Sequence, residues 1–509
     1  MKKLLFICVI SILTIPAFAN INGNGYYRVK NYGSQRWASL IDNQGSVDIH
    51  AFAANLHAFY LSNNTDSILF DPGSIIYLKN ITRYQYDVAA QGTSLQSLTD
   101  IPINIMQDGT ADGQALYRIY GTKSGTTAYI SDGRANKTSP TGKAAISRDP
   151  EGQLANYAKW EIIPVNNTDN YFGTVPTLTV GGKQYTTLFT SFAYKPNSSN
   201  VKAYYIGRVG FGMAEMIEIT GGVPAASPVI IQCAGSKAAD NKMQLLSSQD
   251  ALPDNSLSGV YFNYSDSEYK NYVTYNSSTM RVLGVCSDGS LGFVTAKSLP
   301  NGRIPRNTAY LKVPAGAPAE FKCVTTAEFE ANLPVQPEQF SAGNGQYILQ
   351  PQDDYNYTGI FDIPAQSNLS FQFTSSVNNG SNILVGPAGS NGKNVTISIN
   401  NNVPFEYGNN ASWVIPQWKG GKLHITLNLQ YQYVSFSDGT SSINTITVTD
   451  SNLRYDGFSI VSAASEAIKI VDLSGRIVAQ GVGSIDVSDL GKGIYVAISG
   501  KDSLKFFRK

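Results

Sequence analysis

The chain has few charged residues, and their signs are balanced. Charged side chains make up 15% of 509 residues, and 38 Lys and Arg against 37 Asp and Glu leave a formal net charge of +1. Proteins that bind nucleic acid or anionic membranes through electrostatics carry a clear excess of positive charge. We therefore expect no nucleic-acid partner.

Histidine is scarce, and the common catalytic motifs are missing. The three histidines are His50, His57 and His424. His50 and His57 fall on an expected helix about 10 Å apart along its axis, which is too far to share one metal ion. The sequence has no HExxH, P-loop, dinucleotide fingerprint or Gly-x-Ser-x-Gly. We predict no metal, no cofactor and no catalytic residues, and we expect a protein that is not an enzyme.

One enzymatic alternative stays open, because a glycosidase needs only two carboxyl groups that the fold brings together. Asp353, Asp354 and Glu406 are candidates for such a pair. A secreted glycosidase-like hydrolase is therefore the alternative function.

Cysteine is also rare. Cys8 lies in the amino-terminal leader, which leaves Cys233, Cys286 and Cys323. An odd number of cysteines leaves at least one thiol without an intrachain partner, although one disulfide remains possible outside the cytoplasm. Each cysteine sits in an apolar, strand-like run, so we favour small buried side chains over a structural bridge.

What the chain does have is the composition of a β protein. It contains 30 Tyr and 46 Gly, with Tyr-, Thr- and Val-containing runs cut by Gly, Asn, Asp and Pro. Such runs are typical of short strands and turns. The sequence predicts an all-β, multi-domain protein.

The first nineteen residues have the pattern of a signal peptide. Lys2 and Lys3 precede an apolar core over Leu4 to Ile15, and Ala17-Phe18-Ala19 forms a small-x-small cleavage site. The apolar core is too short to span a bilayer, and no later run approaches that length. We assign residues 1–19 to a signal peptide and expect a protein exported to the periplasm, with no transmembrane segment after cleavage.

Residues 20–166 contain a weak internal repeat of aromatic-x-aliphatic strands, which begin at Gly25, Ser74, Ala115 and Ala158. This segment resembles the ricin-type β-trefoil modules of secreted proteins. The resemblance implies that the strand from Tyr26 to Lys30 pairs with the strand from Trp160 to Val165. Apolar residues at helical spacing from Ile49 to Phe59 predict a helix that interrupts the repeat.

Two further β domains are expected. Residues 172–325 resemble an accessory β module of secreted bacterial proteins, with Pro224, Pro228 and Pro305 at strand edges. Glu328 to Pro337 is an expected linker. Period-two alternation over residues 338–458 predicts a β-sandwich.

Four aromatic residues of the expected sandwich form a candidate carbohydrate-binding platform, because sugar rings stack on aromatic faces and amides bind their hydroxyls. They are Trp413, Trp418, Tyr431 and Tyr433. The segment resembles starch-binding surface modules. The two tryptophans are five positions apart, an odd separation, so strand alternation places them on opposite faces, with one of them exposed.

Residues 466–509 carry the most specific pattern. The strand-turn order IKIVDLSGRIV followed by DLGKGIYVAI closely resembles the C-terminal sorting domain of the type IX secretion system. The resemblance implies a partner, the type IX secretion machinery, and a secreted or outer-membrane surface location. The matching positions are Asp472, Gly475, Arg476, Gly493, Tyr495, Lys505 and Lys509. The sequence thus predicts an exported glycan-binding or adhesin-like surface protein.

Overall fold

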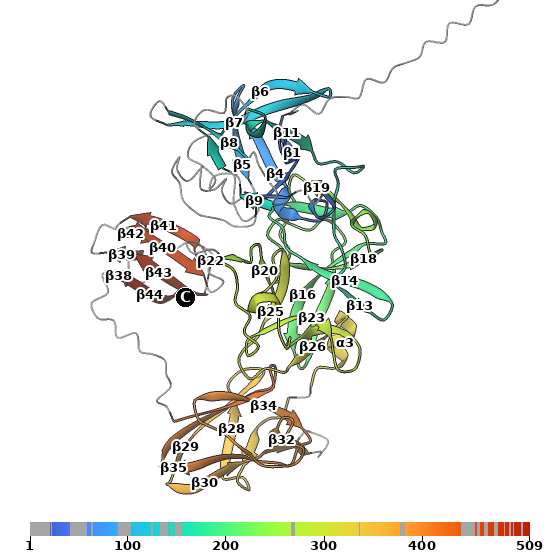
Figure 1. Ribbon diagram of the computed structural model, residues 1–509. Helices are drawn as coiled ribbons and strands as arrows, with labels where there is room; N and C mark the ends of the chain where they lie inside the picture. The colour runs from blue at the N-terminus through green and yellow to red at the C-terminus, as the bar shows by residue number, and fades with distance from the viewer. Residues whose placement is uncertain are drawn as a thin grey trace, which may run out of the picture.

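In the computed structural model, the regular secondary structure of the described residues is almost entirely β-strand (Figure 1). The helices among the described residues are short: α2 spans Thr65–Ile68 and α3 spans Thr326–Ala331. The all-β prediction is confirmed. The described residues are 21, 23–40, 59–62, 65–89, 103–123, 126–132, 141–143, 145–147, 155–265, 270–334, 336–376, 382–438, 453–455, 459–462, 467–472, 477–482, 484–487, 490–491, 493–499 and 502–508.

Two expectations fall largely outside this part of the chain. The signal peptide, residues 1–19, is not among the described residues, and neither is most of the helix expected from Ile49. Phe59, the last residue of that expected helix, begins strand β3. Within the described ranges, no helix combines the length and the apolar character needed to cross a membrane.

The amino-terminal unit, residues 21–165, is one sheet of eleven strands whose first and last strands pair. Tyr27 lies opposite Pro164, and Asn31 lies opposite Trp160, so the predicted pairing of these segments is confirmed. The strands are β1 Gly25–Asn31, β2 Trp37–Leu40, β3 Phe59–Ser62, β4 Ile76–Asn80, β5 Gln85–Ala89, β6 Ile103–Ala111, β7 Gln114–Lys123, β8 Thr126–Ser131, β9 Thr141–Lys143, β10 Ala145–Ser147 and β11 Trp160–Pro164.

The interior of this unit explains why the ends of the segment come together. Trp160 is 1% exposed and donates its indole N–H to the carbonyl of Ile130 at 2.9 Å. Arg36 and Asp132 form a buried ion pair between segments far apart in the sequence. Both contacts join segments about 30 to 96 residues apart in the sequence, so they stabilise the folded unit.

The middle unit, residues 172–324, is built on a ten-stranded sheet in the order β13-β14-β18-β16-β17-β26-β24-β23-β25-β20. A three-stranded sheet, β12-β19-β15, and the pair β21-β22 complete it. The bounds are β12 Phe172–Gly173, β13 Leu178–Val180, β14 Lys183–Leu188, β15 Ala193–Pro196, β16 Lys202–Gly210, β17 Met213–Glu218, β18 Val229–Cys233, β19 Lys242–Leu246, β20 Leu257–Val260, β21 Tyr264–Ser265, β22 Lys270–Asn271, β23 Met280–Val285, β24 Leu291–Val294, β25 Thr308–Lys312 and β26 Glu320–Val324.

The amino-terminal and middle units share buried contacts. Ile75 of the first unit belongs to the same apolar cluster as Phe172 of the second, and Tyr26 packs against it. Arg306 donates to the carboxylate of Asp71 at 2.6 Å across the same boundary. The two units therefore lie against each other through both apolar and charged contacts.

The connection after the middle unit starts as a helix and not as the linker expected from Glu328. Thr325 caps α3 by accepting from the backbone N–H of Glu328, and the Glu328 carboxylate accepts from the N–H of Thr325 at 2.8 Å. Phe329 is 2% exposed. The reciprocal cap and this buried ring hold the segment in place.

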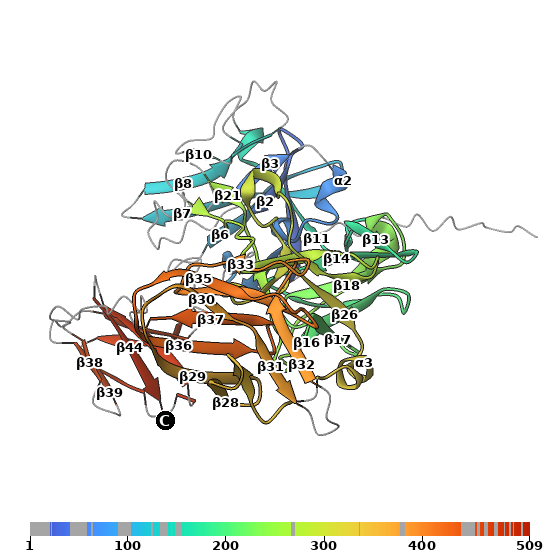
Figure 2. The same cartoon turned by 90° about the horizontal axis from the view of Figure 1, so that it is seen from below.

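Within residues 340–437, eight strands form a closed barrel in the order β27-β28-β29-β36-β37-β34-β32-β31, closed where Ser341 lies opposite Thr374. The strands β30, β35 and β33 form a separate three-stranded sheet that shares the apolar core of the barrel. Figure 2 shows β28, β29, β36 and β37 beside one another. The alternating strands and packed interior expected of a sandwich are present, and hydrogen bonds additionally close the strands into a ring. The bounds are β27 Phe340–Ala342, β28 Tyr347–Pro351, β29 Asn356–Ile363, β30 Gln366–Phe371, β31 Phe373–Ser376, β32 Asn382–Pro387, β33 Val395–Thr396, β34 Asn401–Tyr407, β35 Trp413–Trp418, β36 Gly421–Asn428 and β37 Tyr433–Ser437.

The carboxyl-terminal module, residues 453–508, has its own apolar core. Leu453, Ile460, Ile468 and Ala497 belong to one cluster that contains no described residue of the other units. The strands form sheets of three and four. They are β38 Leu453–Tyr455, β39 Ser459–Ser462, β40 Ala467–Asp472, β41 Ile477–Val482, β42 Ser484–Asp486, β43 Gly493–Ser499 and β44 Asp502–Arg508.

Candidate functional site

The middle unit and the barrel meet at the turn between β16 and β17. Phe211 at this turn has a φ of 57°, a conformation that costs a bulky residue roughly 1–2 kcal/mol. Its ring lies against Tyr355 of the barrel with the centroids 5.0 Å apart. Its backbone N–H donates to the carbonyl of Gln430 at 2.7 Å. These contacts across the interface offset the strained backbone.

The middle unit also approaches the barrel closely at Gly316. Its φ is +85°, and a Cβ built on it would lie 2.8 Å from the Cβ of Asn402 in the barrel. The amide of Asn402 donates to the carbonyl of Ala315 at 2.9 Å. The middle unit therefore contacts the barrel with no room for a side chain at this point.

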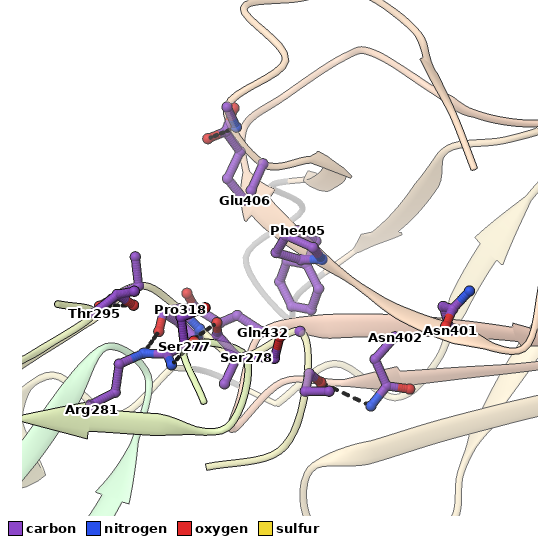
Figure 3. A pocket seen from close by; sticks show the side chains of 17 residues that line it. Ser277, Ser278, Arg281, Thr295, Pro318, Asn401, Asn402, Phe405, Glu406 and Gln432 are labelled. Carbon is purple, nitrogen blue, oxygen red and sulfur yellow. Dashed lines mark hydrogen bonds between the residues drawn. The ribbon is translucent and has the colours of Figure 1, made fainter. Parts of the chain in front are cut away.

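Beside Gly316 the two units separate and leave an open cavity of about 840 Å³ (Figure 3). This volume lies within the range of small-ligand sites. The middle unit lines one wall with the segments around Ser277, Arg281, Thr295 and Ala315 to Ala319, and the barrel lines the other with the segments around Ala388, Asn401 to Glu406 and Gln432. We call this cavity the interface pocket.

Arg281 organises the wall on the side of the middle unit. Its guanidinium donates to the backbone carbonyls of Pro318, Ala317, Ser277 and Met280 at 2.7 to 2.9 Å, and the residue is 3% exposed. Burial lowers the pKa of this guanidinium, with Tyr275 opposing the shift. Because its donors point into backbone carbonyls, Arg281 fixes the loop that borders the pocket.

Glu406 is an exposed carboxylate on the barrel wall. It accepts from the backbone N–H of Gly389 at 3.1 Å and from the amide of Asn409 at 2.7 Å. Both partners are uncharged, so they orient the carboxylate without neutralising it. Figure 3 shows Glu406 well separated from Arg281.

Gln432 lines the pocket with a polar side chain, and its own backbone is held in an unusual conformation. Its φ is 49°, and its carbonyl accepts from the N–H of Phe405 at 2.9 Å. Its side chain is half-buried and lines the pocket. A non-glycine residue in the left-handed region of a pocket wall is the kind of strain that accompanies binding sites.

The pocket therefore presents amides, hydroxyls, backbone groups and one carboxylate. Its lining residues as described include one carboxyl group, that of Glu406. Within the described residues there is also no cluster of three or more His, Cys, Asp or Glu that could hold a metal ion. This chemistry suits binding of a hydroxyl-rich ligand.

The predicted tryptophan platform is not formed. Trp413 is 1% exposed and Trp418 is 7% exposed, and both belong to the barrel core. The expectation that alternation exposes one of them is wrong because Gln417, with a φ of 52°, interrupts the alternation of β35. Pro416 and Gln417 both face solvent, and Trp418 turns inward to donate its indole N–H to the carbonyl of Ile363 at 3.0 Å.

Tyr431 and Tyr433 lie near the interface and do not form a platform with the tryptophans. Tyr431 is half-buried against the core of the middle unit. Tyr433 is half-buried beside Gly316. Burial raises the pKa of both phenols. Of the four predicted residues, these two lie close to the interface pocket, but neither lines it.

Among the carboxylates of the enzymatic alternative, Asp353 holds a turn. It accepts from the amide of Asn356 and from the backbone N–H groups of Tyr355 and Asn356. The side-chain hydrogen bond from Asn356 lowers the pKa of Asp353. Asp353 does not line the interface pocket with Glu406.

The expected sorting residues fall on three adjacent strands, β40, β43 and β44, where the structure describes them. Asp472 of β40 lies opposite Tyr495 of β43. The Tyr495 hydroxyl donates to the carbonyl of Gly491 at 2.9 Å, and its ring stacks on Phe506 with the centroids 5.7 Å apart. Gly493 begins β43, and Lys505 lies in β44. Gly475, Arg476 and Lys509 lie outside the described residues.

The three cysteines are free, as the favoured interpretation predicted. Cys233 and Cys286 are buried, and Cys323 is half-buried. Burial raises the pKa of all three thiols, to about 12 at Cys233. Protonated, buried thiols behave as small apolar side chains.

Sequence reasoning missed the interface pocket because its walls come from two segments more than 60 residues apart, and neither carries a motif. The strained residues Gln432 and Phe211 give no signal in the sequence. Comparisons of the chain with protein-family models, with curated proteins and with solved structures found no match.

Proposed function

We propose that this chain is an exported, non-enzymatic surface or secreted protein that binds glycans in the interface pocket. The observation that carries the proposal is the pocket itself, a cavity of about 840 Å³ with hydroxyls on the wall of the middle unit and side-chain amides on the wall of the barrel. Amides can donate to and accept from sugar hydroxyls at once. Local backbone geometry fixes Gln432, and close contacts fix the segment around Gly316. Both features support a preformed site.

The chemistry of the lining favours binding over hydrolysis. Most glycosidases place two carboxyl groups on either side of the bond that they cleave. The lining residues that the structure describes contribute one, Glu406. A glycosidase therefore remains the alternative, and product release would distinguish it.

The test uses a glycan array and the full mature chain. Replacing Gln432 with alanine removes one side-chain amide from the pocket. Loss of about one hydrogen bond, roughly 0.5–1.5 kcal/mol, should weaken binding of an array glycan about two- to tenfold. Isothermal titration of the same glycan gives the affinity.

Gln366→Ala is the matched control, because Gln366 is an exposed glutamine in β30 that does not line the pocket. It should bind as the unaltered protein does. The proposal fails if no glycan on the array binds, or if Gln432→Ala and Gln366→Ala bind equally well. Release of shorter sugars from a bound glycan would support the hydrolase.

We also propose that the carboxyl-terminal module is a type IX sorting domain and that the protein reaches the cell surface or the medium through that machinery. The motif residues Asp472 and Tyr495 on paired strands support this proposal. So does the separate apolar core of the module. A module that folds on its own can be recognised and removed without unfolding its cargo.

A further inference from the structure

We propose that Glu406 makes the interface pocket selective for uncharged glycans by repelling acidic ones. This inference rests on the proposed glycan binding and assigns a specificity-determining residue to the same site. The pocket is lined by 17 residues, and Arg281 and Glu406 are the charged ones among them. Selectivity by charge therefore depends on which of these two a ligand can reach.

Arg281 is buried, and most of its hydrogen-bond donors are already occupied. It is 3% exposed, and its guanidinium already donates to four backbone carbonyls. A carboxylate or sulfate on a sugar would have to displace one of these bonds to form a paired contact. Arg281 therefore offers little direct attraction to an acidic ligand.

Glu406 is placed differently, because it is exposed on the barrel wall. Its hydrogen-bond partners are the N–H of Gly389 and the amide of Asn409, and neither cancels its charge. A uronic acid in the pocket would bring a second negative charge toward it. Specificity of this kind arises from the repulsive element against the wrong ligand.

The experiment compares two sets of hexasaccharide probes at low salt: neutral glucose and galactose oligomers, and the glucuronate and galacturonate oligomers of the same length. The unaltered protein should prefer the neutral set. Glu406→Gln keeps the size and polarity of the side chain and removes the charge. It should raise affinity for the acidic set and increase the ratio of acidic to neutral affinity about tenfold.

Glu338→Gln is the matched control, because Glu338 is an exposed carboxylate outside the pocket lining. It should leave both affinities unchanged. A gain in binding cannot come from misfolding, so the expected result is independent of any loss of stability. The inference is overturned if Glu406→Gln leaves the preference as it was, or if Glu338→Gln shifts it equally. Failure of every probe to bind would instead contradict the proposed glycan binding.

Discussion

At the scale of single residues, Gln417 determines where the tryptophans of β35 go. Its φ of 52° lets Pro416 and Gln417 both face outward, so Trp418 returns to the side of Trp413. Both rings are buried in the core shared with the barrel strands, and the ring centroid of Trp413 lies 5.9 Å from that of Phe373 and 6.0 Å from that of Phe436. The residues that could have bound a sugar instead stabilise the barrel.

The burial of Trp413 and Trp418 predicts how removing either ring affects stability. Trp413→Ala and Trp418→Ala should each lower the free energy of unfolding by roughly 3–5 kcal/mol, because each leaves a cavity in a packed core. Urea denaturation of the full chain, followed by near-ultraviolet circular dichroism, measures the loss. Gln366→Ala, at the exposed position opposite Trp418, should change stability by about 0.5 kcal/mol or less. A loss of less than about 1 kcal/mol at either tryptophan would contradict its place in the core.

At the scale of elements, turns fix the interface between the middle unit and the barrel. Gly316 and Gly289 have almost the same φ, +85° and +83°. A Cβ at Gly316 would meet Asn402 at 2.8 Å, whereas a Cβ at Gly289 would have nothing within 4 Å. An alanine at Gly289 therefore measures the cost of the left-handed backbone alone. An alanine at Gly316 adds the cost of the clash with Asn402.

Gly289→Ala should cost about 1–2 kcal/mol of stability through the left-handed backbone alone. Gly316→Ala should cost at least about 1 kcal/mol more, because backbone or Asn402 must shift, and it should also weaken glycan binding. Thermal unfolding of the two variants and titration with an array glycan measure both effects. Equal losses of stability in the two variants would show that the units do not fit closely at Gly316.

At the scale of the whole molecule, the carboxyl-terminal module is separable and the other units are joined. The described core of the module, from Leu453 to Phe506, contains no residue of the other units. The amino-terminal and middle units share a cluster that includes Ile75 and Phe172. Phe211 joins the middle unit to the barrel core. Removing the module should therefore expose no described core of the remaining chain.

Deletion of residues 453–509 should leave the rest folded and trap it in the periplasm, because the proposed sorting signal is lost while the other cores stay complete. Cell fractionation locates the protein, and circular dichroism with a melting curve shows whether it is folded. Fusion of residues 453–509 to an unrelated periplasmic carrier is the converse control and should export that carrier. Export of the shortened chain at the level of the full chain would refute the sorting proposal.

The sequence by itself determined the features that depend on neighbouring residues. Alternating runs and turn residues established the all-β class, and His424 lies on the face of β36 opposite Leu423 and Ile425, as the alternation indicates. The pairing of the first and last strands of the amino-terminal unit was implied by the resemblance of residues 20–166 to β-trefoil modules, and the burial of Cys233 and Cys286 was predictable from their apolar surroundings.

Only the tertiary structure decided the rest. The barrel closes through Ser341 and Thr374, and the pocket joins Gln432 to a loop held by Arg281. These are contacts between distant segments, and no local pattern encodes which segments will meet. Trp418 points inward after the left-handed backbone of Gln417, into a core whose other residues, such as Phe340 and Phe436, come from segments distant in the sequence.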